Sequence, residues 1–222
     1  MSKIQAVLFD CDGVLLESEL YLKKEIHDWL NEHYETFTLS FEDFYKETRG
    51  QAFRDTIKYL ADLGVNAGED FFNAAEDIFF SKYKEITVKM ENVDETLEAL
   101  SHLPKAVCSN GIVSLYADTL EYHGIKHHFE EFFGLDTTKN LKPAPDMFLE
   151  AAEKLNVAIE NCLVIDDSYL SGVPAGKASN AAAVVGFASD EFVEDYMMTD
   201  AGADYVIRNL NELPEIIKNL NS

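Results

Sequence analysis

The chain has 222 residues, 47% of them hydrophobic, yet no apolar run approaches the ~20 residues that a membrane-spanning helix needs. Its 41 acidic and 18 basic side chains give a formal net charge of −23, which argues against nucleic acid as a partner, because phosphate backbones are bound by clustered Lys and Arg. Three cysteines without a spacing pattern exclude a disulfide framework. Since the N-terminus also lacks a signal-peptide pattern, we expect a cytoplasmic protein without a membrane partner.

The first predicted element is a strand, and a helical block follows it. The apolar run Ala6-Val7-Leu8-Phe9 has strand character and ends in two aspartates, Asp10 and Asp12. If the strand continued, its alternation would point both carboxylates the same way. After Leu16 the apolar residues recur at helical spacing. The expected helices cover residues 19–33, 41–48 (with Ser40 as N-cap), 52–63 and 69–86.

From about residue 94 the pattern alternates between helix and strand, which is typical of a parallel sheet covered by helices. The expected helices are 94–101, 113–123, 145–155, 171–179 and 211–220, and the expected strands are 105–108, 132–135, 162–165, 182–185 and 205–206. We therefore predict an α/β fold with a Rossmann-like parallel sheet as its core. Residues 1–16 and 89–222 form that core, and residues 17–88 form an inserted helical domain.

Polar residues occur at four predicted strand ends or loops, in an order that packing does not explain. They are Asp10-Cys11-Asp12-Gly13, Ser109-Asn110-Gly111, Lys142-Pro143-Ala144-Pro145 and Asp166-Asp167-Ser168. Each motif alone has an ordinary structural explanation, such as a turn, a surface lysine or a helix cap. Because open α/β sheets place their ligands beyond the carboxyl ends of the strands, the series as a whole predicts a functional site.

The chemistry that this set favours is phosphoryl transfer. A carboxylate such as Asp10 can attack phosphorus, and Asp12 can serve as general acid and then as general base. Lys142 and the Ser109 hydroxyl, with neighbouring backbone N–H groups, can bind the phosphoryl oxygens. Asp10 and Asp167 offer the oxygen ligands that Mg²⁺ prefers, although Mn²⁺ accepts the same ligands.

At this point the chain resembles the haloacid dehalogenase superfamily of hydrolases, whose four motifs occur here in family order between Asp10 and Asp167. The resemblance implies that the helical insert is the family's cap domain. Because dehalogenases lack the second aspartate, Asp12 favours phosphate chemistry. The implied roles are nucleophile (Asp10), acid/base (Asp12), phosphate binding (Ser109, Asn110 and Lys142), and Mg²⁺ binding (Asp10, the Asp12 carbonyl, Asp167 and, in the outer shell, Asp166).

Within the superfamily, the sugar-phosphate phosphatases and the β-phosphoglucomutases look nearest. The mutases carry a histidine in the first cap helix where this chain has Leu22, and a threonine where it has Ser18. These differences favour a hydrolase. The run from Asn161 to Ser168 resembles phosphatases that act on phosphorylated sugars and sugar acids, such as 6-phosphogluconate.

Two arginines of the helical insert are candidates for substrate recognition. Arg49, which precedes Gly50, and Arg54 suit a second anionic group on the substrate, since guanidinium binds carboxylates in a bidentate manner. Ordinary surface arginines are an equally good interpretation of both.

The sequence leaves two rival functions open. One is a phosphomutase, which would release an isomerised product and little phosphate. The other is a non-catalytic phospho-acceptor, which would accumulate phosphorylated Asp10 without turnover. The expected ligand is in each case a small phosphorylated metabolite, and the choice between monomer and dimer stays open.

Cys11 and Cys108 flank the predicted site residues. Alternation along the strands turns both side chains away from the site, so we expect buried structural thiols.

Overall fold

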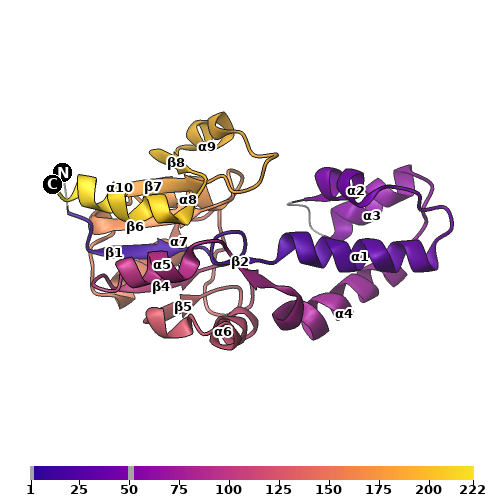
Figure 1. The fold of residues 1–222 in the computed structure, drawn as a ribbon, viewed down its shortest axis with the longest axis horizontal. Coiled ribbons are helices and arrows are strands. Elements are labelled where there is room, and N and C mark those ends of the chain that lie inside the picture. The colour runs from indigo at the N-terminus through magenta and orange to yellow at the C-terminus, as the bar shows by residue number, and fades with distance from the viewer. Residues whose placement is uncertain (1–2, 50–52) are drawn as a thin grey trace. The chain divides into compact units, whose positions relative to one another are not determined.

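The computed structural model describes residues 3–49 and 53–222 (Figure 1). The chain folds into two compact units, one formed by residues 1–16 and 89–222 and the other by residues 17–88. Within the two described ranges, no helix has both the length and the apolar character needed to span a membrane.

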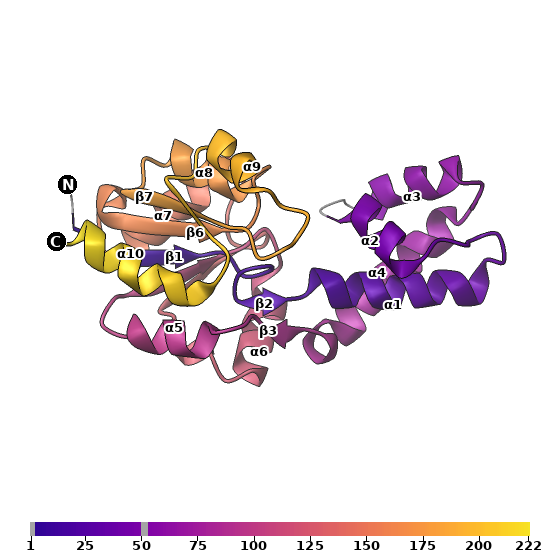
Figure 2. The ribbon, with the colours of Figure 1, turned by 45° about the horizontal axis from the view of Figure 1, so that its top comes forward.

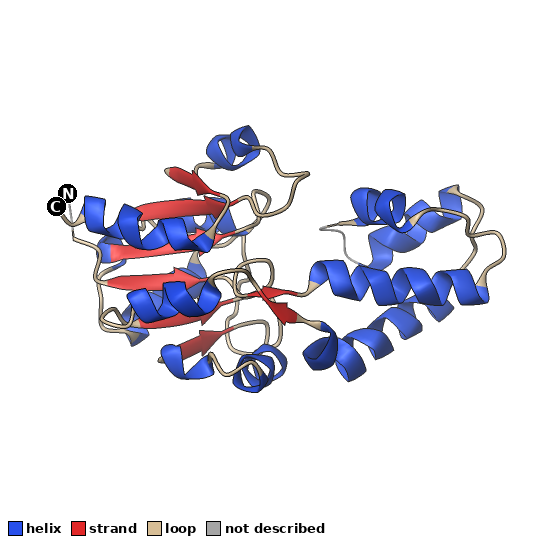
Figure 3. Cartoon of the chain, viewed as in Figure 1, coloured by secondary structure: helices blue, strands red, loops and turns tan. Residues whose placement is uncertain are grey.

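A six-stranded parallel sheet forms the centre of the first unit (Figure 3). The order β5-β4-β1-β6-β7-β8 puts the first strand in the middle, between β4 and β6. This confirms the predicted α/β, Rossmann-like architecture. The strands are β1 (Ala6–Phe9), β4 (Lys105–Cys108), β5 (Glu131–Phe133), β6 (Cys162–Asp166), β7 (Ala183–Phe187) and β8 (Tyr205–Ile207).

Helices cover both faces of this sheet, with α5 and α10 on one face and α7 and α8 on the other (Figures 1 and 2). The central strands can be apolar along their whole length because both of their faces are covered. The helices of this unit are α5 (Val93–Ala99), α6 (Val113–Tyr122), α7 (Asp146–Lys154), α8 (Gly172–Ala178), α9 (Asp195–Ala201) and α10 (Leu213–Leu220). Three short 3₁₀ helices lie at Lys126–His128, Ile159–Asn161 and Leu210–Glu212.

One apolar core of this unit lies between the sheet and α7. Ala6 and Leu8 of β1 belong to the same buried cluster as Met147 and Phe148 of α7. Side chains alternate along a strand, so Val7 and Phe9 face the other side, and both are fully buried as well. The core thus anchors β1 from both faces and fixes the point at which Asp10 leaves the sheet.

The second unit is a helical bundle with its own core. It contains α1 (Glu19–His33), α2 (Phe41–Thr48), α3 (Phe53–Asp62) and α4 (Gly68–Ile86). The Ser40 side chain accepts a hydrogen bond from the Asp43 N–H, which confirms the predicted N-cap of α2. Buried apolar side chains from all of these helices form one cluster, including Ile26, Phe44, Leu60 and Phe71.

Several predicted elements differ from the structure. The strand pair β2 (Leu16–Glu17) and β3 (Val88–Lys89), where the chain passes between the units, was not predicted, and neither was α9. Two-residue strands carry no detectable periodicity, and the seven residues of α9 are too few to show a clear helical repeat. The predicted start of the third helix, residue 52, lies outside the described residues.

Candidate active site

The sheet order brings the predicted site residues of three strands to one edge. In the parallel register, Phe9 of β1 pairs with Val107 of β4 and with Ile165 of β6. The residues that follow them are therefore neighbours beyond the carboxyl ends of the strands. This is the edge at which open α/β sheets bind ligands.

Lys142 joins two of these carboxylates. Its Nζ lies 2.8 Å from Asp10 Oδ1 and 2.7 Å from Asp166 Oδ2. All three side chains are buried, with exposed fractions of 3% for Lys142, 9% for Asp10 and 0% for Asp166. Lys142 thus connects Asp10 of the first motif with Asp166 of the last.

The electrostatic environment differs between the partners. Burial and the neighbouring Asp166 carboxylate raise the pKa of Asp10 to about 7. Burial alone would lower the pKa of Lys142, but the carboxylates of Asp10 and Asp166 raise it above its usual range. The two carboxylates thus hold Lys142 in its charged form. For Asp10, in contrast, the attraction of Lys142 does not offset burial and the repulsion by Asp166, so its ionised form is disfavoured.

The donor set fits a divalent cation. Asp10, Asp166 and Asp167 each offer one carboxylate oxygen, and these oxygens lie within 4.8 Å of one another. The Lys142 ammonium lies against two of these carboxylates, Asp10 and Asp166. Asp10 Oδ1 is buried and, although it is ion-paired to Lys142, no donor in the described part of the chain makes a well-aligned hydrogen bond to it. Hard oxygen ligands of this kind suit Mg²⁺ or Mn²⁺.

Protein donors engage both carboxylate oxygens of Asp166. Oδ2 accepts from Lys142 Nζ at 2.7 Å, and Oδ1 accepts from the backbone N–H of Ser168 at 2.9 Å. Asp166 therefore orients the lysine, a function that its position in the sequence did not indicate.

The loop after β1 carries Asp12 to Ser109. Because β1 ends at Phe9, both aspartates lie beyond the strand, and the expected strand alternation does not orient them. Instead, the Cys11 carbonyl accepts hydrogen bonds from the N–H groups of residues 14, 15 and 16 and so folds the loop back. Ser109 Oγ faces Asp12 Oδ2 at 3.5 Å, which is long for such a hydrogen bond. The predicted acid/base and the predicted phosphate ligand are thus neighbours.

Asn110 holds the backbone of the lysine loop. Its Nδ2 donates to the Lys142 carbonyl at 3.0 Å, and its Oδ1 accepts from the Lys142 N–H at 2.9 Å. The side chain predicted to bind phosphate is therefore already engaged with protein. A contact across 32 residues of sequence could not be foreseen from the motif.

A glycine makes room for Asp166. A Cβ on Gly172, the first residue of α8, would lie 1.8 Å from Asp166 Cγ. We expect Gly172→Ala to lower the free energy of unfolding by about 3 kcal/mol, because a buried, ion-paired carboxylate has to move. Urea denaturation measures this change.

Gly176→Ala is the matched control for that variant, since it lies one turn later in the same helix. Its Cβ would meet a Val164 methyl group at 2.9 Å. We expect a smaller loss of about 1 kcal/mol. Equal losses for the two variants would show that the space at Gly172 is not specific to Asp166.

The two candidate arginines belong to the helical unit. Arg49 follows α2, and its backbone N–H caps that helix by donating to the Tyr45 carbonyl. The Arg54 guanidinium lies over the Phe72 ring, 4.6 Å from its centroid. Gly50, which was singled out with Arg49, lies outside the described residues. The role of both arginines in substrate recognition stays a prediction.

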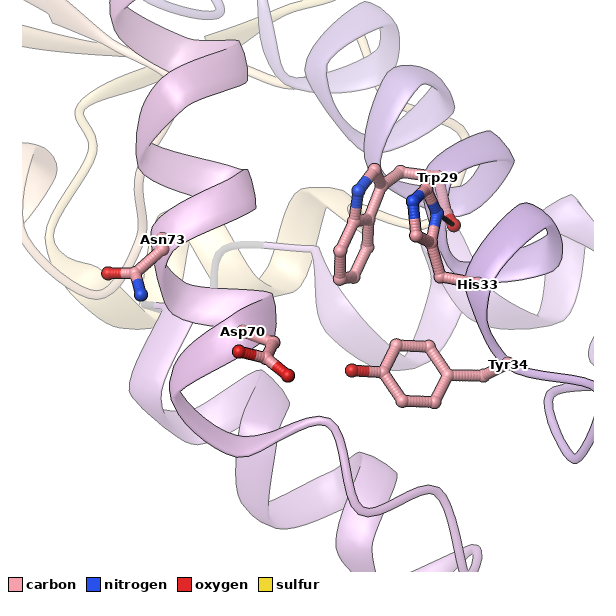
Figure 4. A pocket seen from close by; sticks show the side chains of 5 residues that line it. All are labelled: Trp29, His33, Tyr34, Asp70 and Asn73. Atoms are coloured by element: carbon pink, nitrogen blue, oxygen red, sulfur yellow. Dashed lines mark hydrogen bonds between the residues drawn. The ribbon is translucent and has the colours of Figure 1, made fainter.

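A pocket of about 540 Å³ also lies within the helical unit (Figure 4). Trp29, His33 and Tyr34, at the end of α1, face Asp70 and Asn73 of α4 across it. The His33 ring stacks on the Trp29 indole at a centroid distance of 4.6 Å. The pocket is lined by none of the predicted site residues.

Cys11 and Cys108 are buried, as predicted. Cys11, Cys108 and Cys162 are free and buried, and Cys108 packs in the core beside α7. Burial raises the pKa of the Cys11 and Cys108 thiols. Both side chains are therefore protonated packing groups.

Comparison with known proteins places these features in context. The family model described as haloacid dehalogenase-like hydrolase matches residues 4–180. The 6-phosphogluconate phosphatase of Escherichia coli K12 is 30% identical over 186 residues, which cover 79% of this chain and 81% of that protein.

Solved structures share the fold over nearly the whole chain. A HAD family hydrolase from Deinococcus radiodurans R1, with bound phosphate and sodium, superimposes with a TM-score of 0.83 and 26% identity, covering 99% of this chain and 97% of that one. A protein described as a putative β-phosphoglucomutase from Thermotoga maritima has a TM-score of 0.80 and 24% identity, covering 97% and 99%. The latter shows the similarity of fold alone.

Proposed function

This chain belongs to the haloacid dehalogenase-like hydrolases, and we propose that it is a Mg²⁺-dependent phosphatase of small phosphorylated sugars or sugar acids. The observation that carries the proposal is the buried Lys142 ammonium between Asp10 and Asp166. Asp167 lies beside this pair and Asp12 lies beside Ser109, all at one edge of the sheet. A buried cation beside a carboxylate nucleophile suits a transferred group that carries two negative charges.

In the first step, a carboxylate oxygen of Asp10 attacks phosphorus as the bond from phosphorus to the leaving oxygen breaks. Asp12 gives its proton to that oxygen, so the sugar leaves as an alcohol. The product on the enzyme is an aspartyl-phosphate at Asp10. Lys142, the Ser109 hydroxyl and the backbone N–H of Asn110 bind the phosphoryl oxygens and offset their charge.

In the second step, water attacks the phosphorus of the aspartyl-phosphate. Asp12, now a carboxylate, takes the proton from water, and the bond between phosphorus and the Asp10 oxygen breaks. Free phosphate leaves, and both aspartates return to their starting states. The same side chain thus acts as acid and then as base.

A divalent cation would be held by carboxylate oxygens of Asp10 and Asp167 and by the backbone carbonyl of Asp12. Asp166 suits an outer-shell position, because its own oxygens already accept from Lys142 and Ser168. Bound there, the cation supplies positive charge that neutralises the phosphoryl oxygens. This positive charge would also lower the pKa of Asp10, which burial and Asp166 raise.

Two observations favour hydrolysis of a sugar phosphate over a mutase reaction. The 6-phosphogluconate phosphatase of E. coli is similar over four fifths of its length. Leu22, where the mutases carry a histidine, packs against the apolar core of the helical unit and offers no proton.

With three buried thiols, the chain suits a reducing cytoplasm.

Phosphate release from a panel of phosphorylated sugars and sugar acids, with Mg²⁺ and with EDTA, tests the proposed function. We expect release from a few related compounds, and a fall of at least about 100-fold in EDTA. Mn²⁺ in place of Mg²⁺ shows which ion is preferred. An isomerised product with little phosphate would indicate the mutase, and stable phosphorylation of Asp10 without turnover would indicate the phospho-acceptor.

In this proposal the helical unit is the cap domain that recognises the non-reacting part of the substrate. We expect Arg49→Ala or Arg54→Ala to lower kcat/KM about 10-fold or more for a sugar-acid phosphate, and less for the corresponding neutral sugar phosphate. Steady-state kinetics on such a substrate pair provide the measurement. Unchanged kcat/KM in both variants would remove the arginines from substrate recognition.

A further inference from the structure

The Asn110 side chain pairs with the backbone of Lys142 as one peptide group pairs with another. Its carboxamide donates to the Lys142 carbonyl at 3.0 Å and accepts from the Lys142 N–H at 2.9 Å. Residues of adjacent antiparallel strands exchange the same two bonds. The pairing fixes both polar groups of one residue, and with them the direction in which its side chain leaves the backbone.

This pairing joins the two loops that carry the proposed phosphate ligands. Asn110 follows Ser109 at the end of β4, and Lys142 lies in the loop before α7. Ser109 itself is fixed from two sides, because its N–H donates to the Phe133 carbonyl and its Oγ accepts from the Gly111 N–H. Because Asn110 directly follows Ser109, its pairing fixes the Lys142 backbone relative to Ser109.

We propose that Asn110 is a positioning residue that sets the lysine against Asp10 through the Lys142 backbone. This proposal rests on the proposed function, in which Lys142 binds the transferred phosphoryl group. The Lys142 ammonium reaches Asp10 at 2.8 Å and Asp166 at 2.7 Å, so small shifts of its backbone disturb both contacts. Displacements of about 1 Å in such sites lower rates by up to about 100-fold.

The pairing needs both halves of the carboxamide. Asn110→Ala removes both hydrogen bonds. Asn110→Asp keeps an acceptor for the Lys142 N–H, but it places a carboxylate oxygen against the Lys142 carbonyl, where a donor is needed. The aspartate variant should therefore keep the hydrogen bond from the Lys142 N–H and still misplace the lysine side chain.

Kinetics of four proteins test the proposal: the wild type, Asn110→Ala, Lys142→Ala and the double variant. We expect Asn110→Ala to lower kcat/KM for phosphate release by about 10- to 100-fold in the wild-type background and by less than about 3-fold in the Lys142→Ala background. An equal loss in both backgrounds would mean that Asn110 acts on the substrate directly, and would overturn the proposal. If Lys142→Ala does not fold, Lys142→Arg takes its place in the cycle.

Hydrogen exchange provides a readout that does not depend on activity. The Lys142 amide should exchange at least about 10-fold faster in Asn110→Ala than in the wild type, and stay protected in Asn110→Asp. Asn140→Ala is the control, because Asn140 lies in the same loop and its side chain bonds Asp146 rather than Lys142. A Lys142 amide that exchanges equally fast in the wild type and in Asn110→Ala would overturn the pairing itself.

The two kinds of failure are distinguishable. Full activity of Lys142→Ala, or no phosphate release by the wild type, would contradict the proposed function while the exchange data still decide whether Asn110 holds Lys142. A large loss in Lys142→Ala together with an additive effect of Asn110→Ala contradicts only the positioning role.

Discussion

The Asp10→Asn variant is expected to release phosphate at least about 10⁴-fold more slowly than the wild type. The carboxamide cannot attack phosphorus, so the route through an aspartyl-phosphate is lost, whereas the shape of the side chain is kept. The measurement is phosphate release with Mg²⁺ from the best substrate of the panel.

The fold of this variant has to be checked beside its activity, because Asp10 is buried against Lys142. A circular dichroism spectrum like that of the wild type would assign the loss to chemistry. Asp204→Asn is the control, since it removes a carboxylate from a half-exposed ion pair with Lys177. Activity of Asp10→Asn above about 1% of the wild type would place the nucleophile elsewhere.

The Lys142→Met variant is expected to lower the free energy of unfolding by about 3–5 kcal/mol. It leaves Asp10 and Asp166 buried beside each other without the ammonium that lies 2.8 and 2.7 Å from them. Urea denaturation in EDTA measures the change, because the chelator keeps a bound metal from replacing the lost charge.

Lys177→Met provides the matched comparison. Its Nζ lies 2.7 Å from Asp204 Oδ1, the same distance as in the buried pair, but the lysine side chain is 54% exposed. We expect a change of at most about 1 kcal/mol, since water screens the charges of exposed pairs. Similar losses in the free energy of unfolding for the two variants would contradict the view that burial makes the Lys142 ion pair the more important one for stability.

Loss of Lys142 is expected to lower activity as well as stability. Removing Lys142 takes away the ammonium that lies 2.8 Å from the proposed nucleophile, Asp10. The buried ion pair thus serves the site and the fold at once, and variants at either end will change both. Stability and kinetics therefore have to be measured on the same preparations.

Local signals determined most of the secondary structure. The helix over residues 19–33 follows from a regular apolar stripe, and the strand 105–108 from a short buried run between polar residues. The N-cap at Ser40 follows from a hydroxyl directly before a helical pattern. These features depend on neighbours within a few residues, so the sequence alone contains them.

The sequence also determined which motifs meet, because parallel strands bring their carboxyl ends to one edge. Asp10 and Ser109 each follow a strand and Asp166 ends one, and the sheet order β4-β1-β6 places those strands side by side. The order of the motifs indicated the chemistry but not the contacts between them.

Tertiary structure alone decided how the side chains share their hydrogen bonds. Asp166 was expected in the outer shell of a metal, and only the structure shows that its oxygens accept from Lys142 and Ser168, in space that Gly172 leaves open. Asn110 was expected to bind phosphate, yet its carboxamide pairs with the Lys142 backbone. Such bonds depend on distances of a few tenths of an ångström between segments far apart in the chain, which residue type and spacing do not contain.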